Sequence, residues 1–156
     1  MNSRSTRRTW SRCSLLAVAV AACSTSPLAP ERSALGEARA AWAANAPDAY
    51  TYQFRRICFC GGEVTRAVWI DVAAGVVVSV VPVDDGPPLQ TPIDEYPTID
   101  ELFEEIQDAI DADAHQLLAT YDEERGYPVD VSIDFILEAI DEEMGFQVRE
   151  FAGSIE

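Results

Sequence analysis

The sequence predicts an α+β domain in which an antiparallel sheet of about six strands carries two helices on one face. Segments with the two-residue alternation of a half-buried strand come in two groups of three. A segment with helical spacing precedes each group, which gives the order α-β-β-β-α-β-β-β. Helices gathered on one face of an antiparallel sheet are the usual packing for elements in this order.

The first helix is expected to begin after Ser33, whose hydroxyl suits the N-cap position. Leu35, Ala38 and Trp42 then recur on one helical face, and Pro47 lies beyond the expected end of the helix.

Three predicted strands follow this helix. The first has an aromatic residue at every second position: Tyr50, Tyr52 and Phe54. This row suits a core face under the first helix, and the alternative is the lining of a ligand groove. The other two strands are expected in the ranges 64–72 and 76–83, joined by a tight turn over 73–75 in which Gly75 tolerates positive φ.

The second helix has the clearest signals in the chain. A proline-rich loop over 84–97 leads to Thr98-Ile99-Asp100-Glu101, the pattern of a capping box. Apolar residues then recur at helical spacing as far as Ile110, and the opposite face is acidic.

The last three strands are less sharply bounded. Leu117, Ala119 and Tyr121 alternate with polar residues, and so do Val129, Val131 and Ile133 after a turn over 122–126. The segment 135–145 fits no single element, and residues 146–151 are expected to form a closing strand.

The N-terminus has the parts of an export signal. Four arginines without an acidic residue precede an apolar run, Leu15–Ala22, which ends directly before Cys23. Eight residues are too few to span a bilayer, for which about 20 are needed. Val20-Ala21-Ala22-Cys23 resembles the bacterial lipobox, whose cysteine receives lipid and becomes the new N-terminus. An ordinary secretory signal that contains a cysteine is the alternative.

This interpretation divides the chain into a signal peptide (1–22), a lipidated tether (23–32) and a single α+β domain (33–156). The expected location is the cell envelope, with the domain held on the extracytoplasmic side of a membrane by lipid on Cys23.

The exported part of the chain is strongly acidic. Seven arginines against 27 acidic residues give it a formal charge of −20, and the sequence has no lysine. Such a charge excludes nucleic acid as a partner and disfavours lying flat on an anionic bilayer. It is compatible with cationic ligands, with divalent metals or simply with solubility.

Cys58 and Cys60 form the sharpest candidate for chemistry. Residues two apart on a strand have Cα atoms roughly 6.6 Å apart, near the upper limit for a disulfide, so a bend is needed. A structural disulfide is favoured in an oxidising compartment. A redox-active pair and a thiolate metal site are the alternatives.

The other candidates are weaker. His115, the only histidine, is expected to close the acidic helix at its C-terminus, where a cation is favourable. Asp122, Asp134, Asp141 and Glu142 are candidate ligands for calcium in a carboxylate-rich region, although no calcium-loop motif accompanies them. No catalytic residue and no cofactor are predicted.

Several landmarks follow one another in a distinctive order. They are Trp42, Tyr50-Thr51-Tyr52, Cys58-Phe59-Cys60, Pro97 to Phe103, Tyr121-Asp122, Gly126-Tyr127-Pro128, Asp134 and Asp141-Glu142-Glu143. The pattern resembles a family of small bacterial secreted lipoproteins catalogued only as a domain of unknown function. The resemblance runs from about Ser33 to Phe151. It implies a fold and a location but no activity.

We therefore expect a membrane-anchored envelope protein that acts as a non-enzymatic binding or interaction module. Its expected partners are the membrane, reached through Cys23, and an envelope protein. One alternative is a thiol/disulfide-active envelope factor that uses Cys58 and Cys60. The other is a calcium-binding structural lipoprotein.

Overall fold

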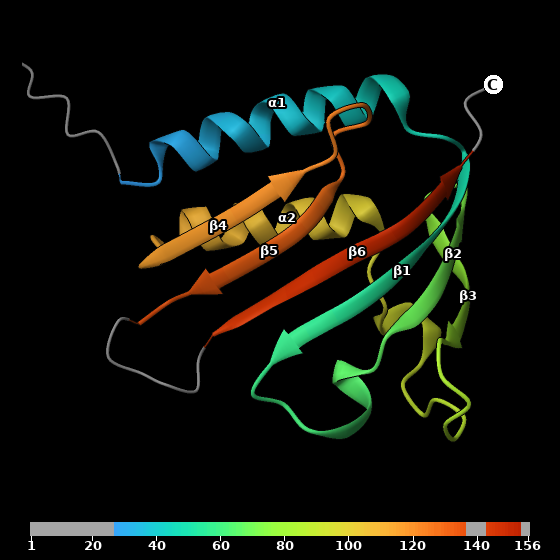
Figure 1. The fold of residues 1–156 in the computed structure, drawn as a ribbon. Helices are drawn as coiled ribbons and strands as arrows, with labels where there is room; N and C mark the ends of the chain where they lie inside the picture. Colours follow the sequence, from blue (N-terminus) through green and yellow to red (C-terminus); the bar gives the residue numbers. More distant parts are fainter. Residues whose placement is uncertain (1–26, 137–142, 154–156) are drawn as a thin grey trace, which may run out of the picture.

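The computed structural model describes residues 27–136 and 143–153, which form one six-stranded sheet with two helices packed on it (Figure 1). The elements in chain order are α1 (Ala29–Asn45), β1 (Ala49–Cys58), the short 3₁₀ helix η1 (Gly62–Thr65), β2 (Val68–Ala73), β3 (Val76–Pro82), a second 3₁₀ helix η2 (Ile93–Glu95), α2 (Ile99–Asp111), β4 (Gln116–Tyr121), β5 (Pro128–Asp134) and β6 (Met144–Gly153). The predicted fold class and the predicted order of helices and strands are confirmed.

The strands lie in the order β3-β2-β1-β6-β5-β4, and every neighbouring pair is antiparallel. The two central strands, β1 and β6, come from opposite ends of the domain. The chain therefore builds two hairpin-linked halves and joins them along its longest strands. Within the described residues, no helix is both long and apolar enough to cross a membrane.

Both helices pack on the same face of the sheet; Figure 1 shows α2 behind the strands and α1 along the top of the molecule. They run antiparallel, because Arg32 near the start of α1 pairs with Asp111 at the end of α2, while Trp42 near the end of α1 donates to Asp100 at the start of α2 (3.2 Å). Tyr50, Tyr52 and Phe54 point into the core under these helices and are buried. The core-face interpretation of this aromatic row is confirmed.

The predicted capping box at the start of α2 is present. The Thr98 side chain accepts from the Glu101 backbone N–H at 3.3 Å, and the Glu101 carboxylate accepts from the Thr98 N–H at 2.7 Å. Two tyrosines of β1 dock this helix start on the sheet, since the Tyr50 hydroxyl accepts from the Ile99 N–H and the Tyr52 hydroxyl donates to the Pro97 carbonyl. The start of α2 is therefore held both by the local capping box and by hydrogen bonds to two tyrosines distant in the sequence.

Two tight turns depend on positive φ. The β2–β3 hairpin turns at Ala74 (φ 51°) and Gly75 (φ 76°), as expected for a two-residue hairpin loop. Gly126, between β4 and β5, has φ 81°, and a Cβ there would lie 2.4 Å from the Ala38 carbonyl oxygen. α1 therefore lies against this turn at a distance that only glycine allows.

Several predicted boundaries are wrong, and the closing strand, expected over 146–151, spans Met144–Gly153. α1 begins at Ala29 rather than after Ser33, with Leu28 as N-cap and a proline in its first turn, and no side chain caps it. The first turn of the helix thus takes up residues that were assigned to the tether, because proline is well tolerated there. The strand expected over 64–72 begins only at Val68, since Gly62–Thr65 forms η1.

Replacement of Thr98 by alanine tests the helix start. We expect Thr98→Ala to lower the free energy of unfolding by about 1–2 kcal/mol, because the backbone N–H of Glu101 loses the side-chain acceptor that caps the helix. Urea denaturation followed by circular dichroism measures this change. The control Thr120→Ala, at an exposed position of β4, should change the free energy by less than about 0.5 kcal/mol. Equal effects of the two substitutions would contradict the role of the cap.

Candidate functional site

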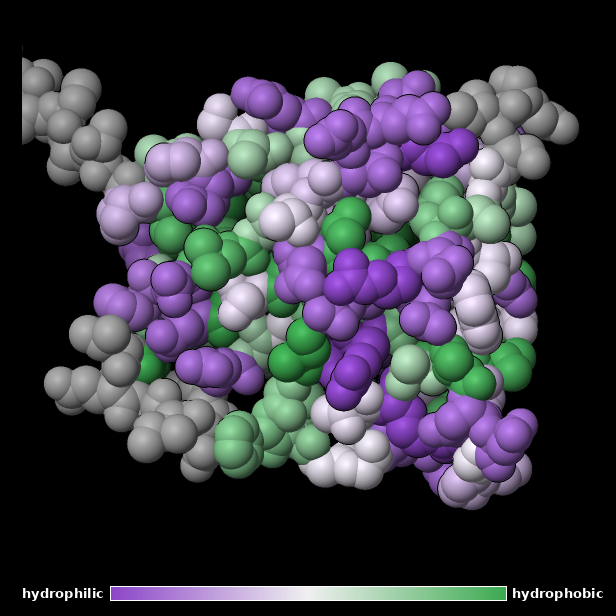
Figure 2. All heavy atoms as spheres, in the orientation of Figure 1, coloured by the Kyte–Doolittle hydropathy of each residue, from purple (hydrophilic) through white to green (hydrophobic). Residues whose placement is uncertain are grey.

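The candidate functional site is the face of the sheet that the helices leave uncovered, which we call the open face. Figure 2 shows this face, and hydrophilic side chains gather over its middle. Side chains along a strand point alternately to its two faces, so the residues between the buried ones point to the open face. Five of these residues form its centre: Gln53 and Arg55 of β1, Trp69 of β2, and Gln147 and Arg149 of β6.

The strand register brings these five residues together. Gln53 is paired with Trp69 on one side and with Arg149 on the other, so the three side chains form one row across the sheet. Arg55 is paired with Gln147 in the next row. Arg55 and Arg149 are therefore diagonal neighbours, close enough for two long side chains to reach the same group.

The two arginines differ in their partners. Arg149 lies 3.4 Å from Asp130 in an ion pair whose members are half exposed, and Gln147 donates to the same carboxylate at 2.8 Å. Such an exposed pair contributes less than about 1 kcal/mol and can be exchanged for another partner at little cost. Arg55 is exposed and has no hydrogen bond or ion pair within the ranges 27–136 and 143–153.

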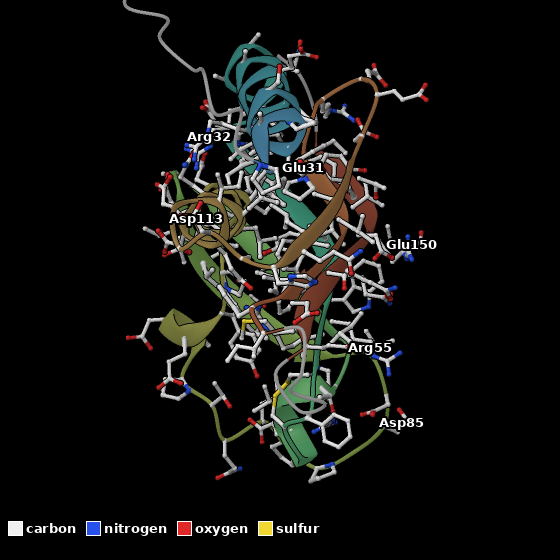
Figure 3. The ribbon with its side chains drawn as sticks, turned by 90° about the vertical axis from the view of Figure 1, so that its left-hand side faces the viewer. Glu31, Arg32, Arg55, Asp85, Asp113 and Glu150 are labelled. Atoms are coloured by element: carbon white, nitrogen blue, oxygen red, sulfur yellow. A yellow bond between two sulfur atoms is a disulfide. The ribbon has the colours of Figure 1, made fainter. Side chains whose placement is uncertain are left out.

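Among the arginines that the structure describes, Arg55 differs from the others in having no partner for its guanidinium. Five of the other arginines described pair with a carboxylate: Arg32, Arg39, Arg56, Arg66 and Arg149. The sixth, Arg125, lies over the ring of Phe151 and donates to the Gly153 carbonyl. Figure 3 shows Arg55 and Glu150 on the side of the sheet opposite the helices.

A shallow hollow of about 420 Å³ lies on the open face beside this centre. Thr51 and Asp71 form part of its lining and are joined by a 2.6 Å hydrogen bond from the Thr51 hydroxyl to the carboxylate. Val78, Ala73 and Ala152 supply apolar surface. The hollow is thus suited to a small apolar group next to a hydrogen-bonding edge.

A second hollow, of about 290 Å³, lies between the two helices and is closed off by internal pairing. Arg39 bonds to Glu104 at 2.9 Å and lies over the Phe103 ring, while the Trp42 indole donates to Asp100. These groups hold the helices together. We therefore assign these residues a structural role, which is to stabilise the packing of the two helices.

Three carboxylates have a lowered pKa, and two of them, Glu63 in η1 and Asp84 in the proline-rich loop, lie close together in the chain's fold. Hydrogen bonds from the Thr91 and Gln90 backbone lower the pKa of Glu63, and the Arg66 guanidinium beside Asp84 lowers the pKa of that carboxyl. Both carboxylates fasten the proline-rich loop to the segment that contains η1. Burial raises the pKa of Tyr50 to about 12, which agrees with its place in the core.

Cys58 and Cys60 are joined by a disulfide at the end of β1, with Cα atoms 5.1 Å apart. The strand ends at Cys58 and the chain bends at Phe59, which brings the two Cα atoms closer than they would be on a straight strand. Phe59, between the two cysteines, is 77% exposed, and Cys60 is exposed as well, so the bridge lies on the surface.

The calcium candidates do not come together. Asp122 and Asp134 lie at opposite ends of β5, and each accepts backbone N–H bonds from the turn that follows it. Asp141 and Glu142 lie outside the described residues. No group of three or more histidine, cysteine or acidic side chains suited to a metal occurs in the part of the chain that the structure describes.

His115 lies in the connection between α2 and β4 and is exposed. The helix ends at Asp111 with Ala112 as its C-cap, so His115 does not close α2, and this expectation is wrong. Cys23 and the signal range 1–22 lie outside the described residues.

Sequence reasoning missed the centre of the open face. The polar positions of β1 were visible as the alternates of the aromatic row, but Trp69 and Arg149 carry no motif. Only their register with Gln53 distinguishes them.

Reduction of the disulfide should have a small effect on stability. The closed loop is very short, so the bridge removes little entropy from the unfolded chain, and we expect reduction to lower the free energy of unfolding by at most about 2 kcal/mol. Urea denaturation with and without a reducing agent measures this change. The double variant Cys58→Ser/Cys60→Ser should match the reduced protein, and global unfolding of either sample would contradict the peripheral role.

Comparison with known proteins gives one match. No curated protein and no solved structure matches this chain. Residues 34–153, which include every strand and both helices apart from the first turns of α1, match a family described only as a family of unknown function. The chain therefore belongs to this family of unknown function, DUF6174.

Proposed function

We propose that this protein is a lipid-anchored module of the cell envelope that binds an anionic partner through the open face and catalyses no reaction. The single observation that carries the proposal is the guanidinium of Arg55, which has no partner among residues 27–136 and 143–153 and lies next to Arg149 and the half-buried Trp69. A strongly acidic protein has many carboxylates available to neutralise an arginine. Leaving one exposed on the uncovered side of the sheet favours an external anion as its partner.

The chemistry of the open face supports a carboxylate or phosphate group on that partner. Arg55 and Arg149 can each bind such a group through two parallel N–H donors, and the side-chain amides of Gln53 and Gln147 lie between them. Trp69 offers a flat apolar surface in the same row. A carboxylate-bearing peptide or polymer with an apolar side group would match the arginines, the tryptophan and the neighbouring hollow together.

The shape of this surface supports binding rather than catalysis. Rate enhancement by charge stabilisation needs a site that excludes water, and the hollow described on the open face is shallow and open to solvent. A partner that lies across the strands would instead bury several half-exposed side chains at once.

The anchor is proposed from the sequence around Cys23. The described domain begins only a few residues later, so lipid on that cysteine would hold the domain close to the membrane surface. The strongly acidic surface suits a protein that stays off an anionic bilayer and faces the space beside it.

The lipid anchor is tested by replacement of Cys23. We expect Cys23→Ser to abolish the incorporation of labelled palmitate and to move the protein from the membrane fraction to the soluble fraction, because the acceptor thiol is lost. Cys13→Ser, within the predicted signal, is the matched control and should leave both properties unchanged. Palmitate labelling of Cys23→Ser would disprove the assignment.

The open face is tested by site-specific photo-crosslinking in cells. A photoreactive residue at Gln53 should form an adduct with one envelope component, and the same residue at Asp108, on the exposed side of α2, should not. Arg55→Glu should reduce the Gln53 adduct at least about tenfold, since loss of a charge-assisted contact and new repulsion together exceed roughly 1.4 kcal/mol.

Arg32→Glu is the charge-matched control for this experiment. Arg32 lies on α1, on the other side of the sheet, and its exposed ion pair contributes little to stability. An adduct that is equally strong from Asp108, or that survives Arg55→Glu, would refute the role of the open face.

A further inference from the structure

Exposed apolar side chains gather at one end of the sheet. The register aligns the end of β1 with the start of β6 and the end of β5, because Cys58 is paired with Met144 and Met144 with Ile133. The residues that we call the apolar end are all exposed there: Ile57, Phe59, Leu118, Phe135, Ile136 and Met144. Figure 1 shows the ends of β1 and β5 and the start of β6 on the same side of the molecule.

The start of α1, which is the first helix of the domain, lies at the same end of the sheet. The ion pair of Arg32 with Asp111 puts the start of α1 beside the end of α2. α2 then leads into β4, whose first residue, Gln116, is paired with Asp134 at the end of β5. Figure 3 looks onto this end, with Glu31, Arg32 and Asp113 on the helix side of the molecule.

The length of the tether decides which end can reach a membrane. Five residues, 24–28, separate Cys23 from Ala29, so the two Cα atoms can be at most about 22 Å apart. β1 alone has ten residues and is about 33 Å long. A lipid on Cys23 therefore holds the end with the start of α1 near the bilayer, and the opposite end points away.

From this juxtaposition we propose that the apolar end is a membrane-contact surface, which inserts Phe59 and its apolar neighbours into the interface of a zwitterionic lipid layer. This inference rests on the proposed lipid anchor. The disulfide between Cys58 and Cys60 fixes the turn from which the Phe59 ring projects. The acidic side chains at this end, among them Asp134 and Glu143, disfavour an anionic surface and favour zwitterionic headgroups.

Insertion of the apolar end into the membrane determines how the open face is oriented relative to the lipid. With the apolar end in the lipid interface, the strands stand upright on the membrane. Arg55 and Trp69 then face sideways, toward material that lies beside the membrane rather than toward the lipid.

Tryptophan fluorescence of the lipidated full chain in phosphatidylcholine vesicles tests the contact. In Phe59→Trp, the added emission should shift to the blue, lose most of its intensity to brominated lipid and resist aqueous iodide. Val76→Trp is the matched control, because Val76 is 58% exposed at the first residue of β3, at the other end of the sheet. Its added emission should be quenched by iodide and unaffected by brominated lipid. The emission of the unsubstituted chain is subtracted in both cases.

Vesicle flotation separates failure of this inference from failure of the anchor. Both variants should float, and both should lose flotation with Cys23→Ser. A chain that floats but shows position 59 open to iodide, as position 76 is, would overturn the membrane contact and leave the anchor standing. A blue shift at position 59 that grows with protein concentration in the absence of vesicles would assign the apolar end to a second copy instead.

Discussion

The docking of α2 on the central strand is the constraint on which the rest of the structure depends. Tyr50 and Tyr52 of β1 hold the residues on either side of Thr98, while Thr98 and Glu101 cap each other's backbone. β1 pairs with β2 on one side and with β6 on the other, so this contact ties the helix to both halves of the sheet. The position of the start of α2 thereby determines which face of the six-stranded sheet is buried.

One-sided burial gives neighbouring residues opposite roles. Arg56 points to the helix side, where it pairs with Glu105 and lies over the Phe54 ring. Arg55, one residue earlier, points to the open face and stays unpaired among the described residues. The two-residue period of a strand therefore separates an arginine that stabilises the core from one that is free to bind.

The two ends of the sheet also differ. At the end away from the start of α1, Trp42, Tyr50, Tyr127 and Phe151 pack ring against ring and close the core. At the other end, Phe59 and its apolar neighbours remain exposed. The two ends of the domain therefore differ in kind, with a closed interior at one end and an exposed apolar surface at the other.

The sequence alone determined the features that depend on residues close together in the chain. The capping box spans four residues, and the hairpin at Gly75 and the alternation of Tyr50 with Tyr52 are equally local, so pattern and propensity sufficed. The start of α1 was missed because its cap uses no side chain. The row of Trp69, Gln53 and Arg149 was decided only by the tertiary structure, since it joins three strands far apart in the sequence. The register of the strands is set by the burial of all the apolar side chains on the helix-covered face together, and no short stretch of sequence encodes it.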